Sequence, residues 1–243
     1  LPDLKPQQVI GEPQRRNTAP CIAYASFKIS WINPEANIVV APSDHVILNE
    51  EQFTESIEHA LNFTMDNDAL VTLGIQPARP DTGYGYIQFR ADQCDAANRI
   101  CKVKTFTEKP NAEMAEFFLK SGEFLWNSGI FIWNAKSILS AFEQYLPEMY
   151  LLFREGLPEY NTGVEAEHIR RIYERCTNIS IDYGIMEKAK NVYVLHSDFG
   201  WSDLGTWGSL YDHIPKDSRG NALVGKNILL YNTGNCIVNM PKE

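Results

Sequence analysis

The sequence lacks any apolar stretch approaching the roughly 20 residues needed to span a bilayer, although 44% of its 243 residues are hydrophobic. It also lacks a run of basic residues, and its formal net charge is -9. The first absence excludes an integral membrane protein. The second disfavours a nucleic-acid polymer as partner, because such binding needs a basic patch that neutralises phosphates. An acidic chain can still bind a small anionic nucleotide where a metal or a local group of cations neutralises the charge.

Paired cysteine motifs are missing as well. The cysteines are odd in number, scattered and without CxxC spacing, at Cys21, Cys94, Cys101, Cys176 and Cys236. This pattern favours reduced thiols in a cytoplasmic enzyme over disulfides or a zinc site. Residues 1–6 lack the charged and apolar regions of a signal peptide. No Met begins the chain, so we expect the numbering to start inside a longer natural protein.

Short apolar runs rich in β-branched residues alternate with amphipathic stretches along the chain. Helical spacing predicts helices at about 50–65, 111–120, 135–145 and 164–176, the second with Asn111 as its N-cap. Strands are predicted at 37–40, 69–75, 84–90, 99–106, 131–133 and 192–195, the third and fourth alternating like a hairpin. Strands interleaved with helices indicate a layered α/β domain. The continuous apolar run at 69–75 is typical of a buried strand in a mostly parallel sheet.

The pattern changes after about residue 215. Residues 215–221 are loop-like. Short strands are predicted at 226–231 and 235–239, separated by an Asn-Thr-Gly turn. We therefore expect a main domain over 1–214, and a linker with the beginning of a separate β-rich unit over 215–243.

Two aspartates occupy positions where a cation could bind. Asp44 comes directly after the predicted strand at 37–40, and Asp203 lies in a loop with two tryptophans. Ligands of open α/β sheets bind outside the carboxyl ends of the strands, and Mg²⁺ binds carboxylate oxygens together with phosphates and water. Taken singly, each aspartate could equally be a cap of a helix or turn. His45 alone could be an ordinary packed histidine.

Three further positions carry chemistry suited to a sugar phosphate. Gly85 could let a ligand approach the backbone closely, with a neighbouring tyrosine as an apolar wall. Glu108 and Lys109 could accept a hydroxyl hydrogen bond and bind a phosphate at one spot. Asn127 offers a donor and an acceptor on one short arm, which suits vicinal sugar hydroxyls. Alone, these residues could equally form an ordinary turn, a surface ion pair and plain core.

The order of these motifs is more informative than any one of them. Segments 12–20, 42–46, 74–77 leading to 82–87, 108–110, 126–129, 180–187 and 201–207 follow one another along the chain. Together they resemble the mannose-1-phosphate guanylyltransferase family, and the resemblance covers essentially residues 9–212. It implies an α/β, Rossmann-like nucleotidyltransferase fold (glycosyltransferase A-like), with a mixed sheet flanked by helices and the start of a left-handed β-helix at the C-terminus. It also implies a reaction in which GMP passes from GTP to mannose 1-phosphate, giving GDP-mannose and pyrophosphate.

The resemblance further implies roles for individual residues. Asp44 and Asp203 would hold an essential Mg²⁺ and Lys109 would contact the sugar's phosphate, so these three are the expected catalytic residues. The nucleotide base would lie among Glu12, Arg16, Asn17, Thr18, Ala19 and Pro20. The mannose would contact Gly85, Glu108 and Asn127, with Asp182 near the sugar pocket.

The chemistry fits such an assignment. A sugar phosphate oxygen attacks the α-phosphorus in line and pyrophosphate leaves, so positioning and charge neutralisation suffice without a protein nucleophile. GTP and mannose 1-phosphate are then the expected partners. A homodimer would cover β-helix rungs that are otherwise exposed.

Two alternatives stay open. One is a guanylyltransferase for another sugar 1-phosphate, since the contacts that separate neighbouring sugars are few and local. The other is a non-catalytic relative that senses a sugar nucleotide, which would suit a chain without a phosphate-binding loop.

The family's glycine-rich loop containing an Arg, and the Pro-Lys segment after it, have no counterpart in this sequence. The cations near the other motifs are Arg15, Arg16, Lys109 and Arg79. With one Mg²⁺ they are too few to neutralise a nucleoside triphosphate and a sugar phosphate together. We therefore expect the 243-residue chain alone to be poorly active or inactive. An assay of GDP-mannose synthesis by this chain tests the expectation, and appreciable synthesis would refute it.

Overall fold

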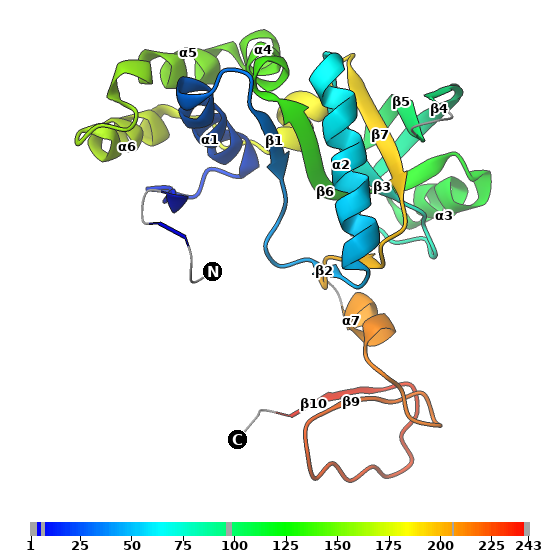
Figure 1. Ribbon diagram of the computed structural model, residues 1–243. Helices are drawn as coiled ribbons and strands as arrows, with labels where there is room; N and C mark the ends of the chain where they lie inside the picture. The colour runs from blue at the N-terminus through cyan, green and yellow to red at the C-terminus, as the bar shows by residue number, and fades with distance from the viewer. Residues whose placement is uncertain (1–3, 6–7, 96–98, 206, 241–243) are drawn as a thin grey trace.

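A six-stranded sheet in the order β1-β6-β3-β7-β5-β4 forms the centre of the computed structural model (Figure 1). The model describes residues 4–5, 8–95, 99–205 and 207–240, without the side chains of residues 212 and 213. The sheet strands are β1 (Asn37–Val40), β3 (Leu70–Ile75), β4 (Tyr86–Asp95), β5 (Ile100–Thr107), β6 (Phe124–Asn134) and β7 (Val192–Ser197). The helices are α1 (Thr18–Ile32), α2 (Glu50–Asp66), α3 (Ala112–Ser121), α4 (Ala135–Tyr145), α5 (Pro147–Glu155), α6 (Glu165–Arg175) and α7 (Trp207–His213), with the short turns η2 (Leu157–Glu159) and η3 (Asp182–Met186).

The sheet is mixed, as the sequence predicts, but it is not mostly parallel. β3 and β7 pair in parallel, whereas β6 pairs antiparallel with β1, β3 and β4. β5 is also antiparallel to both of its neighbours. The expectation of a mostly parallel sheet is wrong because the long strand β6 lies antiparallel between β1 and β3.

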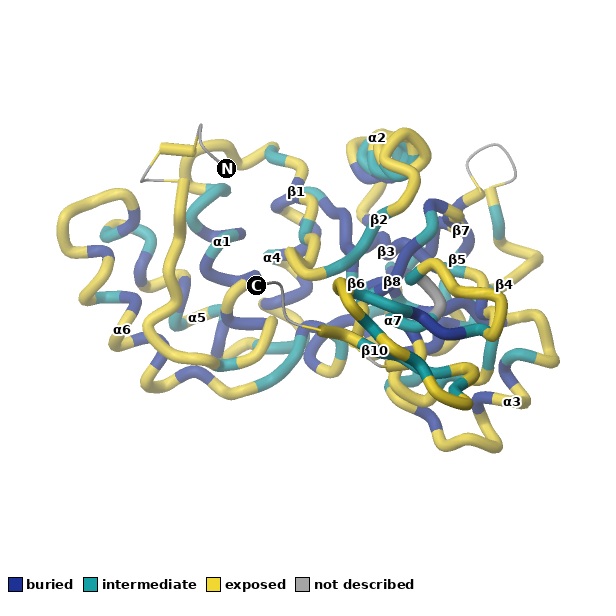
Figure 2. The backbone as a smooth tube through the Cα atoms, turned by 90° about the horizontal axis from the view of Figure 1, so that it is seen from below, coloured by how far each residue is buried: buried dark blue, intermediate teal, exposed yellow. Residues whose placement is uncertain are grey.

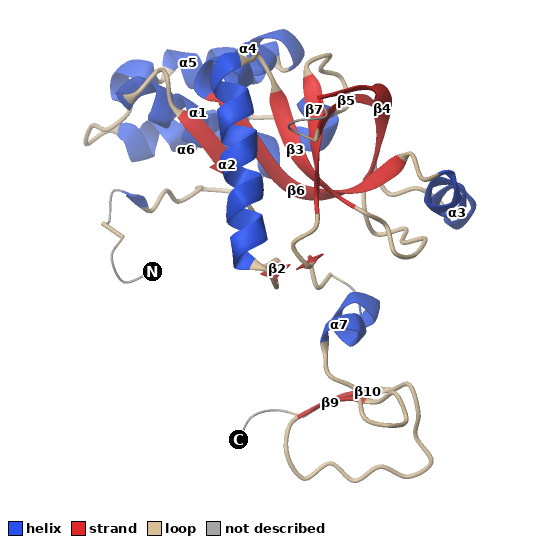
Figure 3. Ribbon diagram, turned by 45° about the vertical axis from the view of Figure 1, so that its right-hand side comes forward, coloured by secondary structure: helices blue, strands red, loops and turns tan. Residues whose placement is uncertain are grey.

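Side chains that alternate along the strands build a separate core on each face of the sheet. Phe131 and Trp133 of β6 belong to the core under α1, α4, α5 and α6, whereas Ile130 and Ile132 belong to the core with α2 and α3. This is the two-residue period of a strand buried on both faces. Figure 3 shows the sheet with helices on both sides, and Figure 2 shows that its strands are largely buried. The α/β layers expected from the sequence are confirmed.

Most predicted elements are found within a few residues of their expected ends. The N-cap is confirmed, because Asn111 Oδ1 accepts from Met114 N at 2.9 Å. Strand β6 is longer than the predicted 131–133, since it runs through Asn127 and Gly129. Helix α1 was not predicted, because its buried side is so wide and apolar that no narrow stripe marks it.

The C-terminal residues form a small unit below the main body in Figure 1. Strands β9 (Ala222–Val224) and β10 (Ile237–Asn239) pair in parallel. The predicted strand at 235–239 is thus present in part, whereas that at 226–231 is wrong. Gly225, Asn227 and Asn232 have positive φ angles, which interrupt an extended strand.

Cys94 and Cys101 form a disulfide between β4 and β5. The prediction of reduced thiols is therefore wrong for this pair, because the hairpin register places the two residues directly opposite one another. Cys21, Cys176 and Cys236 are free.

Two short strands lie outside the main sheet and become important at the site. β2 (Val46–Ile47) and β8 (Trp201–Ser202) pair antiparallel, with Val46 opposite Ser202 and Ile47 opposite Trp201. Within the part of the chain that the structure describes, no helix combines the length and the apolar character needed to cross a membrane.

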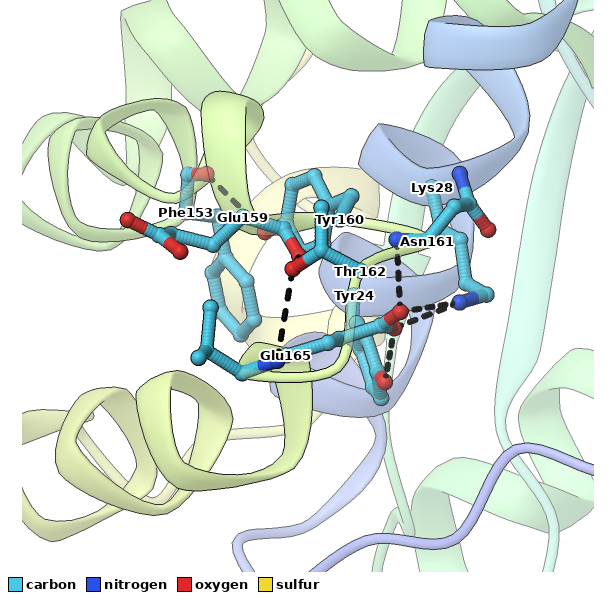
Figure 4. Close-up of polar contacts among 9 residues, drawn as sticks. Tyr24, Lys28, Phe153, Glu159, Tyr160, Asn161, Thr162 and Glu165 are labelled. Carbon is cyan, nitrogen blue, oxygen red and sulfur yellow. Dashed lines mark hydrogen bonds and ion pairs between the residues drawn. The ribbon is translucent and has the colours of Figure 1, made fainter.

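A buried carboxylate ties α1 to α6 (Figure 4). Glu165 is 9% exposed and accepts from Tyr24 Oη at 2.5 Å, from Lys28 Nζ at 2.5 and 2.6 Å, and from Asn161 N at 2.7 Å. Burial alone would raise the pKa of Glu165, but these hydrogen bonds outweigh it and hold the pKa below its ordinary 4.5. The ionised carboxylate therefore contributes to stability.

We predict that Lys28→Ala lowers the free energy of unfolding at pH 7 by roughly 2–3 kcal/mol, because it leaves a buried charge with only its neutral donors. Because the pKa of Glu165 is lowered on folding, the contribution is complete above pH 4.5 and is lost as the pH falls through the folded-state pKa. Urea unfolding on both sides of that value measures the difference. Lys136→Ala is the control, since it breaks only an exposed ion pair with Glu35 and should change little. Equal losses for Lys28→Ala in acid and at pH 7 would contradict this account.

Candidate functional site

A pocket of about 410 Å³ opens where several strand ends meet. Its lining includes, from the residues predicted by sequence, Thr18, Gly85, Glu108, Asn127, Asp182 and Asp203. Gly85 precedes β4, Glu108 follows β5, and Asp203 follows β8. Segments far apart in the chain thus meet at one place.

Asn127 is the hydrogen-bonding centre of this pocket. Its backbone N–H donates to Gly85 O at 2.8 Å, and its side-chain Nδ2 donates to Asp182 Oδ1 at 3.0 Å. Its Oδ1 accepts from Thr72 Oγ1 at 3.0 Å and from Gly129 N at 3.2 Å. The side-chain amide is therefore held in one orientation, which is what a preorganised ligand site requires.

Gly85 and Glu108 lie against each other. A Cβ atom at position 85 would lie 2.5 Å from Glu108 Oε2, so a side chain there would displace the carboxylate. The sequence predicts that a ligand approaches the backbone closely at Gly85, and in the structure the Glu108 carboxylate makes that approach. Lys109 Nζ lies 3.8 Å from Glu108 Oε1, but Lys109 is largely exposed and is not part of the pocket lining. The predicted Glu108–Lys109 pair is therefore present, but only the Glu108 carboxylate lines the pocket.

Two of the carboxyl groups that line the pocket, Glu108 and Asp182, have raised pKa values. Burial raises the pKa of Glu108 and the nearby Asp182 raises it further, whereas Lys109 lowers it. Burial also raises the pKa of Asp182, against the hydrogen bond from Asn127. Such raised carboxyl pKa values are typical of functional clefts, where hydroxyl groups of a ligand could pair with the oxygens.

Asp203 is fixed beside an aromatic wall. Its Oδ1 accepts from Tyr84 Oη and from Gly205 N, both at 2.9 Å. The bond from Gly205 N closes a turn. Because α7 begins only at Trp207, the alternative in which Asp203 caps a helix beginning near Leu204 is wrong. Burial, followed by the hydrogen bond to Asp203, raises the pKa of Tyr84 to about 12. The tyrosine thus stays a neutral donor.

Asp44 lies near Asp203 but does not line the pocket. The β2–β8 pairing brings their two segments together, since Val46 is opposite Ser202. Both aspartates act electrostatically on His45, where burial lowers the pKa and the two carboxylates oppose that shift. Helix α2 is capped by Asn49, so Asp44 is not its cap. Among the described residues, no group of three or more His, Cys, Asp or Glu side chains could hold a metal ion. A pair of aspartates suits only a metal that completes its ligands with phosphate and water, as Mg²⁺ does.

The residues predicted around the nucleotide base cluster at the start of α1. Asn17 has a φ of 66° and accepts from Thr18 N, and Thr18 Oγ1 accepts from Ile181 N. Glu12 and Arg16 are both bonded to Tyr173, through its hydroxyl and its carbonyl respectively. Ala19 and Pro20 are buried in α1. Thr18 alone of this set lines the pocket.

A larger cavity of about 760 Å³ lies beside the Glu165 network. It is lined by Glu12, Lys28 and Arg170, among others. None of the predicted sugar-side residues or aspartates reaches it. We therefore place the candidate site in the smaller pocket, where the predicted residues converge.

Sequence reasoning assigned no role in the site to His45 or Trp201, which form part of the pocket wall. His45 lines the pocket, and its Nδ1 accepts from Trp201 Nε1 at 3.0 Å. Trp201 lines it as well and packs on Tyr84, with 5.2 Å between ring centroids. The adjacent Asp44 and Asp203 were the available signals.

The fold is that of an α/β protein with a mixed central sheet and a pocket lined by polar side chains at the ends of its strands. The model of the nucleotidyl transferase family matches residues 5–220. The chain therefore belongs to the nucleotidyl transferase family, and the nucleotidyltransferase fold expected from the sequence is confirmed.

Among its relatives are enzymes of the kind that the motifs resemble. Mannose-1-phosphate guanylyltransferases of Klebsiella pneumoniae and Escherichia coli are 38% and 37% identical over 236 residues, which cover 97% of this chain and 50% of each relative. The chain thus spans about half the length of these curated relatives. A solved structure, the mannose-1-phosphate geranyltransferase of Thermus thermophilus, has a TM-score of 0.78 and 27% identity, over 89% of this chain and 61% of that one.

We predict that Asp182→Asn lowers the pKa of Glu108 toward its ordinary value, because the largest electrostatic contribution that raises it comes from Asp182. Glu187→Gln is a matched control, since Glu187 raises the same pKa by a smaller amount. A ¹³C NMR titration of the Glu108 carboxyl measures both variants. An unchanged pKa in Asp182→Asn, or a larger change in Glu187→Gln, would contradict the geometry described above.

Proposed function

We propose that the protein transfers GMP from GTP to mannose 1-phosphate, giving GDP-mannose and pyrophosphate. The observation that carries this proposal is the convergence of Gly85, Glu108, Asn127, Asp182 and Asp203 on one pocket. Family membership supports the reaction class, and the relatives named mannose-1-phosphate guanylyltransferase support the substrates.

In this proposal, the hydroxyl groups of the sugar occupy the carboxylate end of the pocket. Glu108 and Asp182 would accept from hydroxyls, and Gly85 would allow the sugar ring to approach the backbone. Asn127 would fix the position of Gly85 relative to Asp182 in the sugar site, because it already bonds both residues. Lys109, whose ammonium group is exposed to solvent, would reach the phosphate of the sugar 1-phosphate.

Asp44 and Asp203 would hold Mg²⁺, which, when bound, supplies neutralisation of phosphate charge. Glu12, Arg16, Asn17, Thr18, Ala19 and Pro20 would lie around the nucleotide base. The protein's own contribution to the step is to fix the sugar phosphate in line with the α-phosphorus, so that its oxygen attacks as pyrophosphate leaves.

The division of the chain at 214/215 is also part of the proposal. The parallel pair β9–β10 is the kind of pairing with which a β-helix begins, and it supports a left-handed β-helix that starts within 215–243. Leu229 and Tyr231 of this segment are each 84% exposed. A homodimer or further β-helix rungs would cover them. A cytoplasmic location, without nucleic-acid or membrane partners, remains a prediction.

A second candidate within the same chemistry is transfer to another sugar 1-phosphate, which the small number of polar groups in the pocket favours. Rates with a panel of sugar 1-phosphates separate the two. A non-catalytic sensor of sugar nucleotides would bind GDP-mannose but release no pyrophosphate with any of them.

Asp203→Asn tests the proposal at its most specific residue. We predict that it lowers pyrophosphate release by the full-length protein, with Mg²⁺, GTP and mannose 1-phosphate, by about 100-fold or more, since one of two charged metal ligands is lost. The amide retains an oxygen for Tyr84 and Gly205, so the local structure should persist. Asp66→Asn, at the exposed end of α2, is the matched control and should be neutral. Full activity of Asp203→Asn would overturn the assignment.

A further inference from the structure

His45 is held in the pocket wall by an interaction that fixes where its proton lies. Trp201 Nε1 donates to His45 Nδ1 at 3.0 Å, and the two rings meet edge to face, at 5.4 Å and 83°. An indole nitrogen is a donor only, so Nδ1 must be the unprotonated nitrogen. The imidazole is then the neutral tautomer that carries its hydrogen on Nε2.

The other ring nitrogen, Nε2, belongs to a side chain that lines the pocket. Within the described residues, no hydrogen bond engages Nε2, and it is not among the buried atoms that lack a partner. A Cβ atom at Gly129 would lie 3.8 Å from His45 Cε1, so the ring carbon next to Nε2 is close to another residue that lines the pocket. The ring therefore presents a free donor to whatever binds there.

The ring has little freedom to turn away. Trp201 is 8% exposed and is paired through β8 with β2, the strand that follows His45 directly. Trp201 also packs on Tyr84, which donates to Asp203. The backbone of Trp201 is thus fixed by its pairing with β2, and its indole is fixed by packing on Tyr84.

We infer that His45 Nε2–H donates a hydrogen bond to a phosphate oxygen of the bound substrates, and that Trp201 is the positioning residue that keeps this tautomer. This rests on the proposed function, in which Asp44 and Asp203 gather phosphates beside His45. Carboxylates cannot donate to a phosphate, so the wall between them needs a donor of its own. The phosphate is that of the sugar 1-phosphate or of the nucleotide.

The tautomer can be tested without turnover. In ¹⁵N-labelled protein, we expect His45 Nδ1 to resonate as an unprotonated nitrogen and Nε2 as a protonated one, and mannose 1-phosphate or GTP to shift the Nε2–H signal. Trp201→Phe keeps a ring but removes the donor, so the two tautomers should mix. Trp133→Phe is the control, since it removes an indole whose Nε1 has no hydrogen-bond partner among the described residues, on the opposite face of the sheet. A proton on Nδ1 in the native protein, or no response of Nε2–H to either ligand, would overturn the inference.

Steady-state kinetics of His45 variants identify which substrate carries the phosphate that His45 contacts. In the full-length protein, we expect His45→Phe to raise the KM of one substrate about 10- to 100-fold, the range for a lost hydrogen bond to a charged group. A rise for mannose 1-phosphate assigns the contact to the sugar phosphate, and a rise for GTP assigns it to the nucleotide. His45→Gln, whose Nε2 hydrogens can replace the donor, should recover part of the loss, and His168→Gln, outside the pocket, should be neutral. A folded His45→Phe variant with both KM values unchanged would refute the contact. Native protein that releases no pyrophosphate would instead refute the proposed function, and the NMR experiment would then decide on His45.

Discussion

Asn127 joins the pieces of the pocket through both its backbone and its side chain. Its N–H bonds Gly85, its amide nitrogen bonds Asp182, and its amide oxygen bonds Thr72 in the neighbouring strand. These contacts occur where the β3–β6 register shifts, between Thr72 and Gly74. The irregularity leaves the Gly129 N–H of β6 without a regular strand partner, and the side-chain oxygen of Asn127 accepts from it.

The two cores explain why this irregular stretch can be tolerated. Residues of β6 on either side of it, such as Leu125 and Ile132, are almost fully buried, and helices cover both faces of the sheet. The buried strand holds Asn127 rigidly, whereas His45 directly precedes the short strand β2 and Asp203 directly follows its partner β8. The pocket therefore combines a rigid floor with a wall fixed by aromatic packing and hydrogen bonds.

Sequence reasoning predicted the layers and most helices, and six of the residues that it singled out line the pocket, because each rests on local signals. Asn111 as a cap and the apolar run of β3 are examples. It missed α1, whose wide apolar surface gives no stripe, and it placed a strand over Asn227, whose positive φ angle prevents one. It also missed the Trp201–His45 bond, because 156 residues separate its partners. The disulfide of Cys94 and Cys101 depends on hairpin register, which spacing alone does not reveal.

In the proposed function, one pocket receives both the sugar and the metal-bound phosphates. A crystal structure of the protein with GDP-mannose and Mn²⁺, whose anomalous signal marks the metal, tests this most directly. We expect mannose between Gly85, Glu108 and Asn127, and a Mn²⁺ peak bound by Asp44 and Asp203. Ligand ordered instead in the cavity between α1 and α6, or a metal peak away from both aspartates, would contradict it.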